Sequence, residues 1–386
     1  MKICIVSDAY YPYPSGVSEY TFYLAKYLRR RGHKVKILTT NYPNERGIEG
    51  KEFEEDVIRI GRVFFLRANK SYATPTIGLG VSRIVKEFLN KENFDILQLH
   101  TPLLPPSLSF YSLLASKTAN IAVFHSATFR IWSFGKNIFR KFFKEYQKKI
   151  IKLVAVSPSA RDCVLSYVPG DYKIIPCGVD IERFNDKVKP KEKFLKNSNY
   201  KILFLGRLDR RKGLSELLKA FSVVKNKLKD AILIVAGRGP LEKKCKKLAR
   251  KLKIENSVFF EGFIPENEVP SYYSSCDVYC SPAIGGESFG IVLLEAMACK
   301  KPVLASRIKG YDFIIKDGFN GIFFNPQDPK DIAKKIIKIL KDKNLREKIS
   351  KNAFSFAKEY SWEKIAGEYE KVYIEAISEF KKAKKN

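Results

Sequence analysis

The amino-acid sequence predicts an α/β protein with two Rossmann-like, doubly wound parallel-sheet domains. A length of 386 residues suits two domains of about 150–200 residues each. Short β-branched runs alternate with amphipathic stretches, an order that produces parallel strands joined by right-handed crossovers. A Pro- and Gly-bearing segment, residues 169–180, separates two such series. We therefore expect domains over residues 1–181 and 182–358, with a C-terminal helix in residues 359–386 that packs back on the first domain.

The hydrophobic pattern of each series fixes the expected elements. The strands expected in the first domain are Lys2–Ser7, Val35–Thr39, Val57–Ile60, Ile96–His100 and Ile121–His125. Those expected in the second are Lys201–Leu205, Ala231–Ala236, Ser257–Glu261, Val278–Ser281 and Pro302–Ala305. The expected helices are Val17–Arg31, Gly213–Lys227, Leu241–Leu252, Asp331–Leu340, Leu345–Lys358 and Trp362–Lys382. Ligands of doubly wound sheets bind beyond the carboxyl ends of the strands, so we expect the site in a cleft where the two domains face each other.

The chain is strongly basic, with 71 Lys and Arg against 41 Asp and Glu and a net charge of +30. Such a field attracts an anionic membrane surface, nucleic acid or a phosphorylated ligand, although a lysine-rich composition bias explains it equally well. No apolar run approaches the roughly 18–20 residues that span a bilayer. The N-terminus is typical of a first strand rather than a signal peptide, so we expect a cytoplasmic protein. Its seven cysteines are scattered, which favours reduced, buried thiols.

The most informative stretch is Gly285–Ala298, GGESFGIVLLEAMA, which follows an expected strand and opens a helix. A helix N-terminus presents free N–H groups to a phosphate or sugar oxygen, and Gly290 in the first turn permits close approach. Glu287 can reach a sugar hydroxyl and Glu295 can accept hydrogen bonds from a ribose diol. The alternative is a core helix with two incidental acids, but a buried Glu without a partner is costly.

A second stretch, Gly206–Gly213 or GRLDRRKG, carries Arg207 and Lys212 from a strand end into a helix. Two cations at the carboxyl edge suit a diphosphate, and the alternative is a solvated basic loop. In the first domain, Gly16 lies at a strand–helix turn that can approach a phosphate.

Three histidines occur in the chain. His125 ends an expected strand, where an imidazole can hydrogen-bond a sugar, and we expect it to be functional. His100 is a weaker candidate of the same kind, and His33 is expected to be a turn residue. No Asp-x-Asp triplet, Gly-x-x-x-x-Gly-Lys-Ser/Thr loop or serine elbow occurs, so we expect no metal site.

These residues resemble the GT4 family of retaining glycosyltransferases, whose Glu-x7-Glu pattern reads here as Glu287 to Glu295. The resemblance extends over nearly the whole chain and is strongest to the phosphatidylinositol mannosyltransferases. Its specific part is the segment Tyr279–Ala298, and the supporting matches are His100-Thr-Pro, Phe124-His125-Ser126, Ile175-Pro-Cys-Gly-Val-Asp180 and Gly206-Arg207. In the usual Gly-Gly pair, Ser15 replaces the first glycine.

The resemblance implies a GT-B fold with a nucleotide-sugar donor in the C-terminal domain and an acceptor in the N-terminal domain. It implies that no cofactor is required and that a divalent metal is not obligatory. Its implied catalytic residues are His125, Glu287, Arg207 and Lys212. Its implied donor-binding residues are Gly16, Arg207, Lys212, Glu287, Ser288, Phe289, Gly290, Ile291 and Glu295, with Gly16 on the diphosphate and the 289–291 amides on sugar and phosphate.

The acceptor is left open, because the loop Arg62–Thr76 does not keep the family's inositol-phosphate contacts. The segment Lys136–Lys152 is a basic amphipathic helix that either lies in an anionic membrane interface or packs its aromatic face on the sheet. The loop with Tyr10, Tyr11 and Tyr13 adds an aromatic surface that suits a lipid.

We therefore expect mannose transfer from GDP-mannose to a phosphatidylinositol-type lipid, by an enzyme peripheral to the inner face of the cell membrane. A glucosyl- or galactosyltransferase using a UDP-sugar and a soluble glycan remains an alternative, and a sugar-nucleotide epimerase of the same fold is a weaker one. A nucleic-acid-binding protein is a remote alternative, and no nucleic acid is expected as a partner, because the sequence has no recognition motif.

Overall fold

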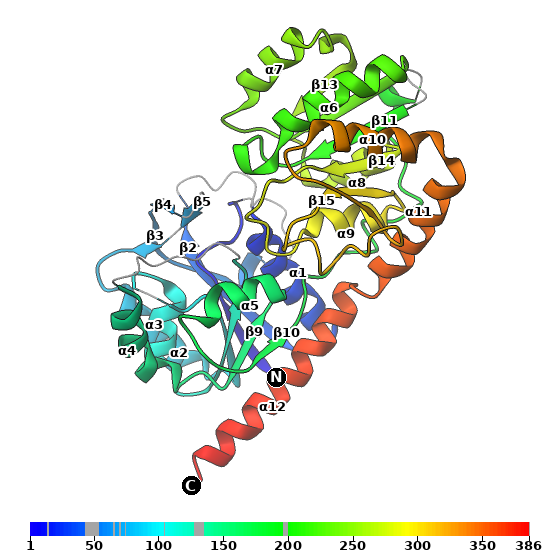
Figure 1. Cartoon of the computed structure of the whole chain (residues 1–386). Helices are drawn as coiled ribbons and strands as arrows, with labels where there is room; N and C mark the ends of the chain where they lie inside the picture. Colours follow the sequence, from blue (N-terminus) through cyan, green and yellow to red (C-terminus); the bar gives the residue numbers. More distant parts are fainter. Residues whose placement is uncertain are drawn as a thin grey trace. The chain divides into compact units, whose positions relative to one another are not determined.

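The computed structural model describes residues 1–13, 15–42, 54–64, 66–68, 71–73, 75–103, 105–126, 135–195 and 200–385. For residues 66–68, 71–73 and 135–138 it describes the backbone alone. The chain divides into two compact units, shown in Figure 1. Unit 1 comprises residues 1–178 and 362–386, and unit 2 comprises residues 179–361.

Unit 1 is built on a sheet with the strand order β10-β9-β8-β7-β1-β2-β3-β6. Every pairing is parallel except the antiparallel β3–β6 pair. Its strands are β1 (Lys2–Val6), β2 (Lys34–Asn41), β3 (Val57–Val63), β6 (Thr76–Ile77), β7 (Ile96–His100), β8 (Ala119–Phe124), β9 (Lys152–Ala155) and β10 (Tyr172–Ile174), with a separate hairpin of β4 (Leu66–Ala68) and β5 (Ser71–Ala73). The strand order reverses at β1, between β7 and β2, so β1 marks the position where doubly wound sheets bind ligands.

The helices of unit 1 connect these strands and cover the sheet. They are α1 (Gly16–Arg30), α2 (Val81–Glu92), α3 (Leu108–Ala115), α4 (Gly135–Gln147), α5 (Pro158–Leu165) and α12 (Trp362–Ala383). The C-terminal helix α12, labelled in Figure 1, packs against α1 and β8, and its inner face buries Trp362, Tyr369 and Tyr373. A Cβ on Gly178 would lie 2.5 Å from the Trp362 ring, so backbone and indole are in direct contact.

Unit 2 contains an all-parallel sheet with the order β13-β12-β11-β14-β15-β16. The strands are β11 (Tyr200–Leu205), β12 (Ala231–Ala236), β13 (Val258–Gly262), β14 (Val278–Ser281), β15 (Val303–Ser306) and β16 (Ile322–Phe324). The helices are α6 (Leu214–Lys227), α7 (Glu242–Lys251), α8 (Val269–Ser274), α9 (Ile291–Ala298), α10 (Pro329–Lys341) and α11 (Lys343–Lys358). Here the order reverses at β11, between β12 and β14, which makes the ends of β11 and β14 the expected ligand position.

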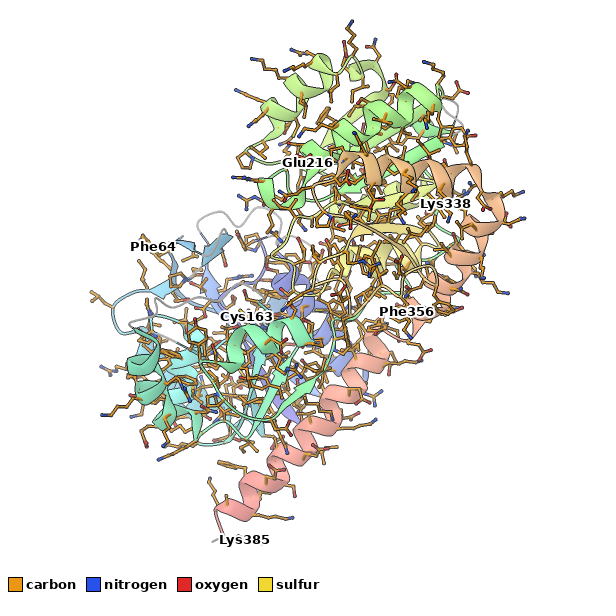
Figure 2. All side chains as sticks on the ribbon, in the orientation of Figure 1. Phe64, Cys163, Glu216, Lys338, Phe356 and Lys385 are labelled. Carbon is orange, nitrogen blue, oxygen red and sulfur yellow. The ribbon has the colours of Figure 1, made fainter. Side chains whose placement is uncertain are left out.

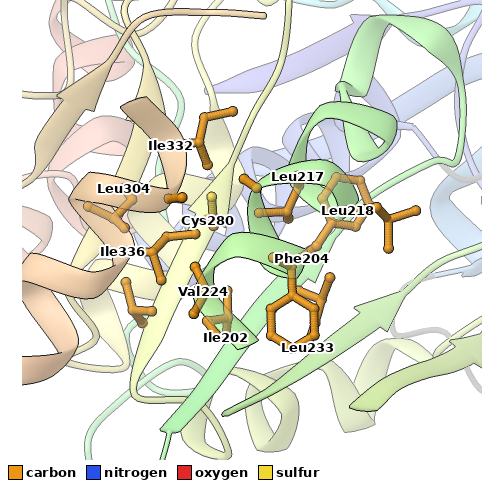
Figure 3. Packing of buried hydrophobic residues seen from close by; sticks show 14 of the residues in the cluster. Ile202, Phe204, Leu217, Leu218, Val224, Leu233, Cys280, Leu304, Ile332 and Ile336 are labelled. Carbon is orange, nitrogen blue, oxygen red and sulfur yellow. The ribbon is translucent and has the colours of Figure 1, made fainter. Parts of the chain in front are cut away.

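A continuous apolar cluster holds unit 2 together. Strand residues Ile202, Phe204 and Leu233 meet Leu217 from α6 and Ile336 from α10, and all five are buried (Figure 3). β12 is buried along its whole length, as expected for an inner strand of a sheet covered on both faces. This rigid core fixes the loops that leave the carboxyl ends of the strands.

Two aromatic features of unit 1 that suit a lipid surface in the sequence lie partly in the core. The helix expected within residues 136–152 is α4, and its Phe139 and Phe143 are buried. Of the two alternatives for this helix, packing against the protein is therefore confirmed for Phe139 and Phe143. Phe142 is 41% exposed. In the tyrosine loop, Tyr10 and Tyr11 are buried, so the expectation of an exposed aromatic loop is wrong for them.

The charge of the chain lies at its surface, and Figure 2 shows nitrogen-tipped side chains fringing the ribbons of both units. Over the part of the chain that the structure describes, no helix combines the length and apolarity needed to cross a bilayer.

Candidate functional site

The carboxyl edge of the unit 2 sheet contains a compact ion-pair cluster. Glu287, from the segment before α9, places Oε1 2.8 Å from Lys212 Nζ. The same oxygen also accepts a hydrogen bond from Arg211 Nη1, which in addition donates to the Gly286 carbonyl oxygen at 3.1 Å. The Glu287 side chain is only 11% exposed, so the contacts with the two cations occur in a largely dry setting. We name Glu287, Lys212 and Arg211 the carboxylate–dication cluster.

The backbone after β11 explains why these cations gather. Asp209 accepts a hydrogen bond from the Lys212 N–H at 3.1 Å and caps a single 3₁₀ turn, Arg210–Lys212. The turn ends at Gly213 with φ +70°, where a left-handed conformation favours glycine. The backbone N–H of Ile284 donates to the Arg211 carbonyl oxygen at 2.8 Å, which ties this turn to the loop leaving β14. Two separate loops thus converge on one carboxylate.

The cluster changes the protonation of Glu287. Burial raises the pKa of its carboxyl group, but Lys212 and Arg211 outweigh burial and hold the pKa below its ordinary value. Glu287 is therefore an anion at neutral pH. An anionic Glu287 holds two cations at the edge of the sheet, where an incoming diphosphate can recruit them.

Arg207 contributes a further cation to the same edge but is more exposed. It follows Gly206 directly after β11, its side chain is 47% exposed, and its Nε lies 4.0 Å from Asp209 Oδ2. The stem of Lys212 packs over Gly206, because a Cβ built there would lie 3.7 Å from Lys212 Cδ. Arg207 and Lys212 therefore leave neighbouring points of one loop.

The helix start after Glu287 differs from its expected form in one respect. The helix α9 begins at Ile291, so Gly290 is its N-cap with φ +92° rather than a first-turn residue. A Cβ on Gly290 would lie 2.8 Å from the Tyr311 ring, which leaves no room for a side chain. Phe289 is buried, so its ring packs within unit 2, while Ser288 is half-buried.

Glu295 lies inside α9, is buried, and accepts a hydrogen bond from the Tyr273 hydroxyl at 2.8 Å. Burial raises the pKa of Glu295, and the bond from Tyr273 opposes that rise. The cost of burying this acid is thus offset by a hydrogen-bond partner on α8. The bond also fixes the carboxylate orientation for any hydroxyl that approaches it.

In unit 1, Gly16 is the first residue of α1 and is exposed. Ser15 caps this helix, with its hydroxyl accepting from the Ser18 N–H at 3.1 Å. The replacement of a glycine by Ser15 therefore gains a capping hydrogen bond and leaves Gly16 open to a ligand.

His125 follows β8, which ends one residue earlier than expected, at Phe124. Its ring lies 4.6 Å from the Tyr20 ring and 4.7 Å from the His100 ring, measured between centroids. Its Nε2 is buried and has no hydrogen-bond partner among the residues described. Burial lowers the pKa of His125 to about 3, so the imidazole is neutral at physiological pH. A neutral ring with an unused nitrogen can bind a sugar hydroxyl.

The other two histidines have partners. His100 contacts Gln98 and Thr21 in the interior of unit 1. His33 Nε2 lies 3.0 Å from Glu370 Oε1, so this residue links the turn after α1 to α12.

The structure thus groups Glu287 and Lys212, leaves Arg207 on the loop after β11 and Glu295 inside α9, and places Gly16 and His125 in unit 1. Sequence reasoning missed Arg211 as a partner of Glu287 and Tyr273 as the partner of Glu295. Within the described ranges, no three His, Cys, Asp or Glu side chains gather closely enough to hold a metal ion.

Comparison with known proteins identifies the family. Residues 14–183 match the family model described as Glycosyltransferase Family 4, and residues 185–356 match the model described as Glycosyl transferases group 1. A phosphatidyl-myo-inositol mannosyltransferase of Mycolicibacterium smegmatis is 32% identical over 97% of this chain and 93% of its own length. The alpha-monoglucosyldiacylglycerol synthase of Acholeplasma laidlawii is 26% identical over 98% of both chains.

Solved structures agree on the fold. A glycosyltransferase from Rickettsia africae superposes with a TM-score of 0.78 at 23% identity, covering 97% of this chain and 98% of the other. HepE of Anabaena, in complex with UDP, superposes with a TM-score of 0.76 at 18% identity, covering 96% and 99%. The fold is that of the GT-B glycosyltransferases. The chain belongs to glycosyltransferase family 4, and it is a hexosyltransferase.

Proposed function

We propose that the chain is a retaining mannosyltransferase that uses GDP-mannose and a phosphatidylinositol-type lipid acceptor. The observation that carries this proposal is the carboxylate–dication cluster at the ligand position of the unit 2 sheet. The 32% identity to a phosphatidyl-myo-inositol mannosyltransferase supports the choice of sugar and lipid.

Unit 2 holds the donor in this proposal. Lys212, Arg207 and the amides at the start of α9 bind the diphosphate, whose charge grows as the sugar departs. Glu287 orients a sugar hydroxyl, and Glu295 accepts hydrogen bonds from the ribose. The cations already supply positive charge at the edge, so a divalent metal is not obligatory and no cofactor is required.

Unit 1 supplies Gly16 to the diphosphate and His125 to the donor sugar. Retention follows from attack on the same face that the leaving group departs. The acceptor oxygen bonds to the anomeric carbon, the bond from that carbon to the phosphate oxygen breaks, and the acceptor proton passes to the leaving phosphate. No carboxylate is then needed as a covalent nucleophile. A neutral His125 donates or accepts a hydrogen bond and carries no charge.

A lipid acceptor draws support from an exposed apolar surface on unit 1. Leu79 is fully exposed, and Phe64, Ile77 and Ile84 are 51%, 43% and 46% exposed. They belong to one edge of the sheet and the start of α2, and Phe64 is labelled at the margin of unit 1 in Figure 2. Arg83 lies between Leu79 and Ile84 in sequence and is also exposed. Exposed apolar side chains suit the interfacial region of a bilayer, although Arg83 is paired there with Glu87 at 2.8 Å, so we propose peripheral binding to the inner face of the cell membrane through these apolar contacts.

A second candidate, glucosyl transfer from a UDP-sugar, is favoured by the similarity to the glucosyldiacylglycerol synthase over 98% of both chains. The carboxylate–dication cluster suits either donor, because the roles proposed for it involve the diphosphate and the sugar rather than the base.

A donor and acceptor panel separates the two. The intact protein is mixed with GDP-mannose, UDP-glucose or UDP-galactose, and thermal stabilisation is measured for each. The proposal expects a shift with GDP-mannose and transfer to phosphatidylinositol vesicles, with the α configuration retained in the product. Transfer from UDP-glucose to diacylglycerol, without transfer from GDP-mannose, would replace the first proposal by the second. Isomerised sugar formed from donor alone would indicate an epimerase.

A further inference from the structure

The interior of unit 1 contains a continuous line of hydrogen bonds between polar side chains. Gln98 on β7 accepts from the Tyr373 hydroxyl of α12 at 2.6 Å, and its other amide atom lies 2.9 Å from His100 Nε2. His100 Nδ1 makes a longer contact of 3.4 Å with the Thr21 hydroxyl, which donates to the Val17 carbonyl oxygen at 2.8 Å. All four side chains are buried. We name Tyr373, Gln98, His100 and Thr21 the buried hydrogen-bond chain.

The distances determine which atom donates and which accepts along the buried hydrogen-bond chain. A separation of 2.6 Å between Tyr373 and Gln98 is typical of O–H···O, so the Gln98 oxygen faces the tyrosine and its NH₂ faces His100. His100 Nε2 must then be an unprotonated acceptor, and its proton lies on Nδ1. The contact with Thr21 leads independently to the same tautomer of His100. The Thr21 hydroxyl donates its one proton to the Val17 carbonyl oxygen, so it can only accept from His100.

The chain ends at two places that matter to the proposed site. Val17 follows Gly16 in the first turn of α1. The His100 ring lies 4.7 Å from the His125 ring, and Tyr20 contacts both imidazoles. Burial, and then the neighbouring His125, keep the pKa of His100 well below its ordinary value, so both rings are neutral. A fixed His100 therefore limits how the His125 ring can turn.

We propose that the buried hydrogen-bond chain positions His125 and the first turn of α1 for sugar transfer. Its members are positioning residues, since none of them is assigned a contact with donor or acceptor. This inference rests on the proposed role of His125, whereas the proton position on His100 does not. The proposal thus links a buried tyrosine hydroxyl on the C-terminal helix to the rate of transfer.

The tautomer of His100 is tested directly by ¹⁵N NMR of the intact protein labelled at histidine. The protein has three histidines, so few signals have to be assigned. The proposal expects His100 to carry its proton on Nδ1, with Nε2 unprotonated, at neutral pH. In Gln98→Glu, a carboxylate replaces the amide donor, so Nε2 should gain a proton while Nδ1 keeps the one that Thr21 accepts, and both ring nitrogens of His100 should be protonated. A proton on Nε2 in the unaltered protein overturns the proposal. These spectra do not depend on enzyme turnover. Failure of the buried hydrogen-bond chain can therefore be distinguished from failure of the proposed function.

Kinetics test the positioning role with a matched pair on α12. Tyr373→Phe removes the hydroxyl that orients Gln98, and kcat should fall about fivefold, the loss of one hydrogen bond, with the donor KM changed less than about twofold. Tyr369 lies one turn away and is equally buried, and its hydroxyl interacts with Tyr20 rather than with a member of the buried hydrogen-bond chain. Tyr369→Phe should keep the kcat of the unaltered enzyme. Equal kcat for both variants overturns the proposal.

Discussion

The backbone of Gly213 touches the carbonyl oxygen of Pro282. A Cβ built on Gly213 would lie 1.9 Å from that oxygen, closer than any side chain permits. Gly213 directly follows Lys212, and Pro282 begins the loop that leads from β14 to Glu287. This contact therefore sets the spacing between the two loops that form the carboxylate–dication cluster.

Gly213→Ala should destabilise unit 2 and reduce transfer, because the added methyl group must push the loops apart. We expect an Ala at φ +70° to cost about 1–2 kcal/mol, and the clash to add to that cost. Gly318→Ala is the matched control, since Gly318 has φ +75° and nothing within 4 Å of its Cβ position. Thermal unfolding and kcat of both variants are the measurements. Equal losses in the two would show that the Pro282 contact is unimportant.

Glu287→Ala should lower kcat by about 10²-fold or more while the protein stays folded. The change removes the anion that holds Lys212 and Arg211, and removes the group assigned to the donor sugar. Glu287→Gln keeps the size of the side chain but removes its charge. We expect the kcat of this variant to be lowered nearly as much. Glu242→Ala, which breaks a surface pair with Lys246 on α7, serves as the control. Circular dichroism confirms folding, and unchanged turnover in Glu287→Ala would remove its assigned role.

Arg211→Ala should raise the donor KM by about tenfold, as expected for one charge-assisted hydrogen bond. Arg211 donates to both Glu287 and the Gly286 carbonyl oxygen, so its loss loosens the loop before α9. Arg210 precedes it in the same 3₁₀ turn and is exposed, and Arg210→Ala should change the KM less than about twofold. Steady-state kinetics with donor varied decide this, and a larger effect at position 210 would contradict the geometry.

The sequence predicted the architecture well because hydrophobic periodicity is a local signal. Strands Ile96–His100, Ala231–Ala236 and Val278–Ser281 have the expected bounds. The sheet strands β6, β9, β10 and β16 were missed, since runs of two to four residues carry little pattern to distinguish them from a loop.

The site was harder to predict, because its contacts depend on turn geometry. Three consecutive cations, Arg210 to Lys212, look alike in sequence, and the Asp209 cap decides which of them reach Glu287. Likewise, a buried Glu295 is costly without a partner, and the structure supplies one from within the protein. That partner is Tyr273, which depends on how α8 packs against α9, so burial alone does not argue for a ligand at Glu295.

Leu79→Glu should weaken binding to anionic vesicles by about tenfold at low salt. Leu79 is fully exposed, so the change removes apolar contact with lipid and adds a repulsive charge without disturbing the core. Ile374→Glu on α12 is the control, because Ile374 is 57% exposed but distant in sequence from the apolar surface of residues 64–84. Vesicle sedimentation gives the binding constants. Equal weakening by the two variants would contradict a specific lipid-binding surface.

Asp8 is a source of pH-dependent stability in unit 1. Burial raises the pKa of its carboxyl group to about 6, although bonds from Thr76 Oγ1 at 2.6 Å and the Leu108 N–H at 2.9 Å oppose the rise. An unfolded Asp has a pKa of about 4. At a pH between these two pKa values, Asp8 is protonated more in the folded protein than in the unfolded chain. The free energy of unfolding therefore falls as pH rises from about 4 to about 6.

Asp8→Asn should therefore stabilise the protein at neutral pH. The amide oxygen can still accept from Thr76 and Leu108, while the cost of a buried charge disappears. We expect a gain on the order of 1–3 kcal/mol at pH 7 that shrinks as pH falls towards about 4, where Asp8 is protonated in both states. Denaturant unfolding of both proteins from pH 4.5 to 7.5 measures the difference. A gain that stays constant with pH would show that removing the charge of Asp8 is not its cause.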